Sequence, residues 1–220
     1  KISMTFSYPT PTTIDVFYTN SEGYLITPEV LPYGEYSLVE VQAPYGYALD
    51  KTPVAFSVSL ENAEKENSLT IVKVEKQNTA QKGRISVQKT GDIFTSVNMA
   101  SSAYTDENGE LVVNSTTYTP VFADGDLSGA VFQVIAVEDI VTLDGTTRAY
   151  AGDVVSEITT DENGYAETEP LYLGKYEVRE IKAPDGYVLN NEPKDVEVTY
   201  AGQEIAVLDT VNASFVNDYQ

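Results

Sequence analysis

The sequence predicts an all-β protein that consists of two tandem β-sandwich domains. Short segments in which apolar and polar residues alternate recur along the whole chain, and turns rich in Gly, Pro, Asn and Asp separate them. Tyrosine, threonine and valine, which favour strands, are abundant, whereas strongly periodic helical stretches are absent. A twelve-residue motif occurs twice, which indicates two related domains.

The repeated motif has the form Tyr-x-apolar-x-Glu-x-x-Ala-Pro-x-Gly-Tyr and lies at 36–47 and 176–187. Its first five residues alternate as a strand with one buried face does, and Ala-Pro-x-Gly closes the strand with a turn. The two glutamates, Glu40 and Glu180, are 140 positions apart (180 − 40). A period of this length indicates tandem domains rather than a solenoid.

We expect one domain at 1–82 and a second at 83–220. A short linker is expected at 78–83, and the second domain has a hydroxyl-rich insertion at about 93–128. Alternation predicts strands of the first domain at 1–6, 13–18, 36–40, 54–60 and 69–74. For the second domain it predicts strands at 84–92, 130–136, 155–160, 176–180 and 196–200, a hairpin within the insertion, and closing segments at 204–208 and 213–217.

The composition excludes several classes of function. Thirteen basic and 34 acidic residues give a net charge of −21, which argues against binding to nucleic acid or to anionic membranes. The chain has no cysteine and no histidine, so disulfides, thiol nucleophiles, the usual zinc sites and Ser-His-Asp catalysis are ruled out. We expect no cofactor, no metal and no turnover enzyme. The sequence shows neither a membrane span nor a signal peptide, and we interpret it as a piece of a longer protein.

The motif places a carboxylate on a face that should be apolar. In the second copy, Glu180 points the same way as Tyr176 and Val178. A glutamate that is turned inward is costly unless it is paired or protonated. Most single inward glutamates are paired or lie at a sheet edge, but the repetition of this one favours a chemical role.

Two further polar residues of the second domain lie on apolar faces. On its first strand Lys89 alternates with Ile85 and Val87, and on its last strand Asn217 alternates with Phe215. The first and last strands of a sandwich domain often lie side by side. We therefore expect the lysine, the asparagine and the inward glutamate to meet in one dry core.

Such a trio has a specific chemistry available. Burial disfavours the charged forms of an amine and of a carboxyl group. A neutral amine is a nucleophile, and a protonated carboxyl can polarise the amide carbonyl and shuttle the proton. Attack on the asparagine amide expels ammonia and leaves a Lys–Asn isopeptide bond, once per molecule and without a cofactor.

Three motifs carry a resemblance to a known family. The repeated motif resembles the "E-box" of CnaB-type (prealbumin-like, SpaA, Ig-like) domains of surface proteins and pilins of Gram-positive bacteria. The stretch Ile-Ser-Val-Gln-Lys89-Thr-Gly-Asp resembles the donor-lysine strand of that family, and Phe-Val-Asn217 resembles its terminal asparagine strand. The resemblance covers essentially all of 83–220 and most of 13–82.

For the second domain the resemblance implies that Lys89 is the donor, Asn217 the acceptor and Glu180 the catalytic acid of an isopeptide bond. It also implies tandem prealbumin-like sandwiches and a structural stalk or spacer in a cell-surface or pilus-like protein. Such a protein is extracellular and anchored to the cell wall, and its partners are other domains of the same protein.

The first domain departs from the family pattern. It has Glu40 as the equivalent acid and Asn78 as a possible acceptor, but the position 140 residues before Lys89 falls before Lys1. Lys76 stands where the second domain has an aromatic residue. We therefore expect this domain to lack its N-terminal strands and to have an open edge. No bond is assigned to it within this sequence.

Two other functions remain open. One is a ligand-binding adhesin module that recognises a host matrix protein or a glycan, with the insertion at 93–128 or the loop at 137–153 as its contact surface. The other is an accessory domain of a secreted glycosidase.

Overall fold

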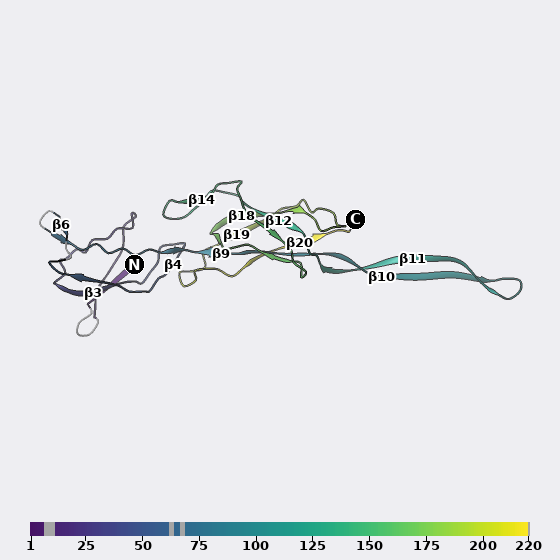
Figure 1. Cartoon of the computed structure of the whole chain (residues 1–220), viewed down its shortest axis with the longest axis horizontal. Coiled ribbons are helices and arrows are strands. Elements are labelled where there is room, and N and C mark those ends of the chain that lie inside the picture. Colours follow the sequence, from purple (N-terminus) through teal and green to yellow (C-terminus); the bar gives the residue numbers. More distant parts are fainter. Residues whose placement is uncertain (7–11, 62–63, 67–68, 220) are drawn as a thin grey trace. The chain divides into compact units, whose positions relative to one another are not determined.

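The computed structural model describes residues 1–6, 12–61, 64–66 and 69–219, and every regular element within these ranges is a β-strand (Figure 1). The prediction of an all-β protein is therefore confirmed. The described residues form two compact units. Unit 1 comprises Lys1–Lys82, Val141–Thr146 and Thr199–Leu208, and unit 2 comprises Gly83–Ile140, Thr147–Val198 and Asp209–Gln220.

The strands of unit 1 form one antiparallel sheet and two short strand pairs. The sheet has the order β2-β1-β3-β5, while β4 pairs with β8 and β6 pairs with β7. The bounds are β1 (Ile2–Phe6), β2 (Thr12–Phe17), β3 (Gly34–Glu40), β4 (Tyr47–Ala48), β5 (Val54–Val58), β6 (Glu64–Glu66), β7 (Leu69–Ile71) and β8 (Thr79–Ala80).

Unit 2 contains two larger sheets. An antiparallel sheet has the order β15-β12-β18-β19, and a second sheet has the order β11-β10-β16 with β20 running parallel to β10. The remaining bounds are β9 (Lys82–Gly83), β10 (Ile85–Thr105), β11 (Leu111–Asp126), β12 (Val131–Ala136), β13 (Ile140–Val141), β14 (Thr147–Ala149), β15 (Val154–Thr159), β16 (Tyr165–Glu167), β17 (Leu171–Tyr172), β18 (Gly174–Lys182), β19 (Lys194–Val198) and β20 (Val211–Asn217).

The sequence repeat corresponds to a repeated sheet. The strand that carries the motif glutamate, β3 or β18, is the third strand of a four-stranded sheet in each unit. Ile2 of β1 lies opposite Glu40, and Phe132 of β12 lies opposite Glu180. The first described strand of unit 1 is therefore the counterpart of β12 and not of β10.

The core of unit 2 lies between its two larger sheets. Inward residues of β10, β12, β18 and β20 alternate with exposed ones, as expected for strands with one buried face. The rings of Phe132 on β12 and Phe215 on β20 are 4.7 Å apart and join the sheets. Burial of one such aromatic side chain stabilises the fold by about 2–3 kcal/mol.

The predicted hairpin in the insertion is a long two-stranded ribbon. β10 pairs with β16 and β20 only as far as Gly91, and from Ile93 onward it pairs with β11 alone. The ribbon continues to a turn between Thr105 and Leu111, and it extends well beyond the sandwich of unit 2 (Figure 1). Thirteen residues at about 3.3 Å each give roughly 40 Å of projecting ribbon.

The strand predicted at 69–74 is shorter than expected. β7 ends at Ile71, and residues 72–78 have no strand partner among the described strands. Their counterparts in unit 2, which lie 139 positions later (217 − 78), form β20 by pairing with β10. An alternating segment becomes a strand only when a neighbour accepts its backbone hydrogen bonds.

The linker expected at 78–83 is wrong, because this segment is packed into unit 1. It contains β8, and Gln81 is only 1% exposed. The Gln81 side chain donates hydrogen bonds to the carbonyl oxygens of Gly202 (2.7 Å) and Ile205 (2.6 Å). Residues 204–208 form no regular strand, and Ile205 among them supplies one of these two carbonyls.

Candidate functional site

Strand β10 carries Lys89 into the core of unit 2. Alternation along β10 turns Ile85, Val87 and Lys89 to the same side, and all three are fully buried. The Lys89 backbone is fixed on both sides, because its amide donates to the carbonyl of Gly164 (2.8 Å) and its carbonyl accepts from the amide of Leu127 (3.0 Å). The lysine side chain therefore has no route to water along its own strand.

Strand β20 places the asparagine beside that lysine. In the parallel register Phe215 lies opposite Lys89, and Asn217 lies opposite Gly91. The long lysine side chain spans this offset, and its Nζ donates to Oδ1 of Asn217 at 2.6 Å. The expectation that the first and last strands lie side by side is confirmed for the described unit 2.

The glutamate reaches the same point from the facing sheet. Asn217 Nδ2 donates to Oε1 and Oε2 of Glu180 at 3.0 and 3.1 Å, and Lys89 Nζ lies 3.9 Å from Glu180 Oε1. The carboxyl also accepts from the backbone amide of Asn190 at 2.7 Å. The turn at Gly186, with φ of 88°, bends the chain back so that this amide can reach the carboxyl.

The environment of Lys89 favours a neutral amine. Burial lowers the pKa of Lys89 to about 8, although the nearby Glu180 carboxylate acts in the opposite direction. The lysine and glutamate side chains are both 0% exposed, so bulk water does not compete for either group. The Lys89 amine therefore loses its proton more readily than an exposed lysine does, and the neutral form is the nucleophile.

The arrangement brings together the three predicted residues of the second domain, and the way these groups face one another suits acyl transfer. The amine faces the carbonyl oxygen of Asn217, and the carboxyl group of Glu180 faces the amide nitrogen, which is the leaving group. The site can therefore form an amide from Lys89 while Glu180 handles the proton.

Unit 1 contains the same acid–amide pair. Asn78 Nδ2 donates to Oε1 and Oε2 of Glu40 at 2.8 and 2.7 Å, and the backbone amide of Asp50 donates to Glu40 Oε2 at 3.1 Å. Glu40 is 5% exposed. Each of these three hydrogen bonds has a counterpart at Glu180, whereas Asn78 Nδ2 donates in addition to the carbonyl of Ala48 at 3.2 Å.

The lysine of unit 1 that lies nearest to Asn78 in sequence is engaged elsewhere. Lys76 Nζ donates to Asp50 Oδ2 (2.9 Å) and to the carbonyl of Thr52 (2.8 Å). This hydrogen bond keeps the pKa of Asp50 far below its usual range. The α-amino group of Lys1 donates to the carbonyl of Gln42 (2.6 Å). Neither residue contributes an amine to Asn78 in the described structure.

The backbone amides that hold the two carboxyl groups were not predicted from the sequence. Asn190 and Asp50 each follow their glutamate by ten positions. The Asn190 side chain also donates to the carbonyl of Val216 (3.1 Å), so it links the motif loop to β20. The equal spacing after each copy of the motif is the signal that could have identified them.

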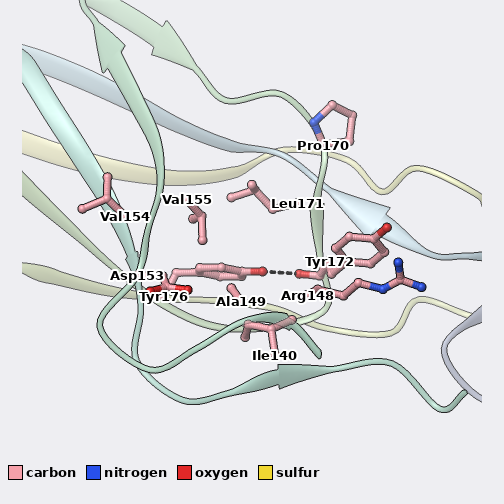
Figure 2. A pocket seen from close by; sticks show the side chains of 10 residues that line it. All are labelled: Ile140, Arg148, Ala149, Asp153, Val154, Val155, Pro170, Leu171, Tyr172 and Tyr176. Carbon is pink, nitrogen blue, oxygen red and sulfur yellow. Dashed lines mark hydrogen bonds between the residues drawn. The ribbon is translucent and has the colours of Figure 1, made fainter. Parts of the chain in front are cut away.

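A surface hollow of about 380 Å³ in unit 2 is separate from this trio (Figure 2). Figure 2 shows the Tyr176 ring across the hollow, with its hydroxyl donating to the carbonyl of Tyr172 at 2.6 Å. The guanidinium of Arg148 lies 4.8 Å from the centroid of the Tyr172 ring. Burial raises the pKa of Tyr176 to about 12. Tyr36 makes the same bond to Pro32 in unit 1 (2.8 Å), which indicates a structural role for the first tyrosine of the motif.

Within the described ranges, no group of three or more His, Cys, Asp or Glu side chains is arranged to hold a metal ion. None of these ranges contains a helix with the length and hydrophobicity needed to cross a bilayer.

Comparison with known proteins relates the chain to bacterial surface proteins. The model of the family described as "SpaA: Prealbumin-like fold domain" matches residues 4–73 and 114–212. The "Trypsin-resistant surface T6 protein" of Streptococcus pyogenes serotype M6 is 29% identical over 110 residues, which make up 50% of this chain and 17% of that protein.

Two solved structures are similar to the chain, and the first of them supports the fold. The Bacillus anthracis TIE protein aligns with a TM-score of 0.54 at 23% identity, covering 99% of this chain and 31% of that chain. The minor pilin of Streptococcus agalactiae aligns with a TM-score of 0.36 at 19% identity, covering 86% of this chain and 62% of that chain. The chain thus spans less than a third of the surface T6 protein and of the TIE protein.

Proposed function

Because the chain belongs to the family of SpaA prealbumin-like fold domains, we propose that it is a structural stalk or spacer of a Gram-positive cell-surface or pilus-like protein, stiffened by an isopeptide bond between Lys89 and Asn217. The observation that carries the proposal is the 2.6 Å contact between the Lys89 amine and the Asn217 amide within hydrogen-bond reach of Glu180. This hydrogen bond to Oδ1 holds the amine beside the amide group whose Cγ it would attack.

The proposed reaction balances, because every atom of the two side chains ends either in the new amide or in the released ammonia. The neutral Lys89 amine attacks Cγ of Asn217, and an N–C bond forms. One proton moves from the amine to Nδ2 through the Glu180 carboxyl, which already accepts a hydrogen bond from that nitrogen. The Cγ–Nδ2 bond then breaks and ammonia leaves. Because the reaction consumes its own residues, the domain is not a turnover enzyme and requires no cofactor.

An extracellular location anchored to the cell wall fits this function. The relatives are named as surface proteins and pilins, and a chain with a net charge of −21 and no cysteine draws no covalent support from disulfides. A cross-link inside the sandwich supplies that support without an external oxidant. The partners we propose are other domains of the same surface protein.

For unit 1 we propose that Asn78 is an acceptor and Glu40 its catalytic acid. The hydrogen bonds between their side chains match those between Asn217 and Glu180, and residues 72–78 belong to none of the described strands. A lysine-bearing strand that ran parallel to 72–78, as β10 runs beside β20, would complete this site.

The ribbon favours a second candidate function, an adhesin that binds a host matrix protein or a glycan. Its strand residues 93–105 and 111–123 contain no charged side chain, in a chain with 47 charged residues (13 + 34). Met99 and Tyr118 lie opposite each other and are both 66% exposed. Depletion of charge around exposed aromatic and Met side chains is typical of the centre of an interface.

The first prediction concerns the mass of the whole chain. It should be lower than the mass of the sequence by one ammonia, and a proteolytic digest should give a branched peptide that contains Lys89 and Asn217. Glu180→Gln should keep the fold and the full sequence mass, because the proton shuttle is lost. Glu40→Gln is the matched control and should still lose one ammonia. A full sequence mass for the parent chain, or normal ammonia loss in Glu180→Gln, would contradict the assignment.

The second prediction concerns stability. A link between residues 128 positions apart removes loop-closure entropy from the unfolded chain and should stabilise unit 2 by about 4–5 kcal/mol. Thermal unfolding followed by circular dichroism should therefore show Lys89→Ala melting roughly 10–20 °C below the parent. Glu180→Gln leaves no cavity, so its change in melting temperature measures the contribution of the Lys89–Asn217 bond. Lys175→Ala, at an exposed lysine, should melt like the parent, and an equal loss there would argue against the cross-link.

The third prediction concerns unit 1. A synthetic peptide with the sequence of residues 84–92 should become attached to Asn78 with release of ammonia, as intact mass would show. The reaction should be abolished by Glu40→Gln or by replacing the peptide lysine with arginine. If no adduct forms and Lys1 or Lys76 is found bonded to Asn78 instead, unit 1 is complete by itself and the proposal for it is wrong.

The fourth prediction separates the stalk from the adhesin. Replacing residues 95–121 with Asn-Gly should shorten the ribbon to a tight hairpin and leave the ammonia loss unchanged. If the protein is an adhesin, the parent should bind at least one member of a panel of immobilised matrix proteins and glycans, and the shortened variant should not. Equal binding by both proteins would exclude the ribbon as the contact surface.

A further inference from the structure

The last tyrosine of the second motif copy touches both strands of the reactive site in unit 2. The Tyr187 hydroxyl donates to the carbonyl oxygen of Asp92 at 2.7 Å, on β10 just after Lys89. The Tyr187 and Tyr219 rings are 5.5 Å apart and nearly perpendicular, and the two residues also form an antiparallel backbone bridge. Tyr187 therefore connects the motif loop to β10 on one side and to the end of β20 on the other.

Tyr187 also covers the end of the strand pair where the reacting amide lies. A Cβ atom added to Gly91 would lie 2.6 Å from the backbone oxygen of Asn217, 2.7 Å from Cδ1 of Leu127 and 3.3 Å from Cε1 of Tyr187. Gly91 is the residue opposite Asn217 in the β10–β20 register. The tyrosine ring and Leu127 thus pack closely around the Gly91 end of the strand pair.

In unit 1 the counterpart of Tyr187 makes the same backbone contacts but different side-chain contacts. The amide of Tyr47, the counterpart of Tyr187, donates to the carbonyl of Pro44 (3.2 Å), and Tyr47 pairs with Ala80 as Tyr187 pairs with Tyr219. The Tyr47 hydroxyl accepts a bond from the amide of Asp144 (3.4 Å). The tyrosine ring pair and the hydroxyl bond to the strand that carries Lys89 are thus features of unit 2.

We propose that Tyr187 is a positioning residue for the reaction of Lys89 with Asn217, an inference that rests on the proposed function. Its hydroxyl fixes β10 beyond the lysine, and its ring excludes water from the amide. If water entered, it would attack Cγ of Asn217, the Cγ–Nδ2 bond would break, and ammonia would leave an aspartate at position 217. Tyr187 therefore controls both the rate of cross-linking and the choice between amine and water as nucleophile.

The test follows the reaction in the whole chain as it is made. The chain is produced by cell-free translation, samples are quenched in acidic denaturant, and intact mass gives the cross-linked, hydrolysed and unreacted fractions. Tyr187→Ala should cross-link at least roughly tenfold more slowly than the parent, since a misplacement on the order of 1 Å can cost about a hundredfold in rate. It should also accumulate the hydrolysed form. Tyr187→Phe retains the ring and should be slower than the parent without hydrolysis.

Matched variants separate positioning from folding. Tyr47→Ala, at the counterpart in unit 1, should react like the parent. The proposal is overturned if Tyr187→Ala cross-links at the parent rate without hydrolysis. If Tyr187→Ala fails to fold, Tyr187→Phe decides, and a parent-like rate for it would refute the role of the hydroxyl. A parent chain that retains its ammonia would overturn the cross-link itself, whereas a reactive parent with unaffected Tyr187 variants would overturn this proposal alone.

Discussion

The contact among Lys89, Asn217 and Glu180 is the constraint on which the rest of unit 2 depends. Three polar groups are enclosed among apolar side chains, and an unpaired charge in such a place costs several kcal/mol. The cost is offset only while β10, β20 and β18 remain in their observed registers, because each strand supplies one member. A slip of one residue on any strand would turn its polar group to the other face and remove one partner from the trio.

The two copies of the motif differ in their neighbouring strands, so features that both copies share depend on the motif, and features that differ depend on its neighbours. Both copies form a strand, a turn and a buried carboxyl that is held by an asparagine and by a backbone amide ten residues later. The strand, the turn and the backbone amide are local, whereas the asparagine lies 38 residues after the glutamate in unit 1 and 37 in unit 2. The lysine contact is absent from the described part of unit 1 because it requires a strand that the motif does not contain. The motif therefore specifies the buried carboxyl and its backbone donor, and other strands supply the asparagine and the lysine.

Much of the fold and of the candidate site could be predicted, because the alternation of apolar and polar residues along a strand indicates which side chains are buried. Inward positions for Lys89, Glu180 and Asn217 follow from their apolar neighbours at every second residue, and the structure brings the three together. Burial of Gln81 could not be predicted, since its partners lie 121 and 124 positions away. The early end of the strand predicted at 69–74 could not be foreseen either, because alternation does not tell whether a neighbouring strand accepts the backbone hydrogen bonds.

The parallel pairing of β10 and β20 has a mechanical consequence. In this parallel pair the start of β10 at Ile85 and the end of β20 at Asn217 lie at opposite ends of the paired strands. Tension on the chain therefore slides one strand along the other and loads all of the hydrogen bonds between them at once. Strands pulled apart from the same end would instead lose those bonds one after another. The order of the strands thus gives this unit resistance to stretching before any covalent link is considered.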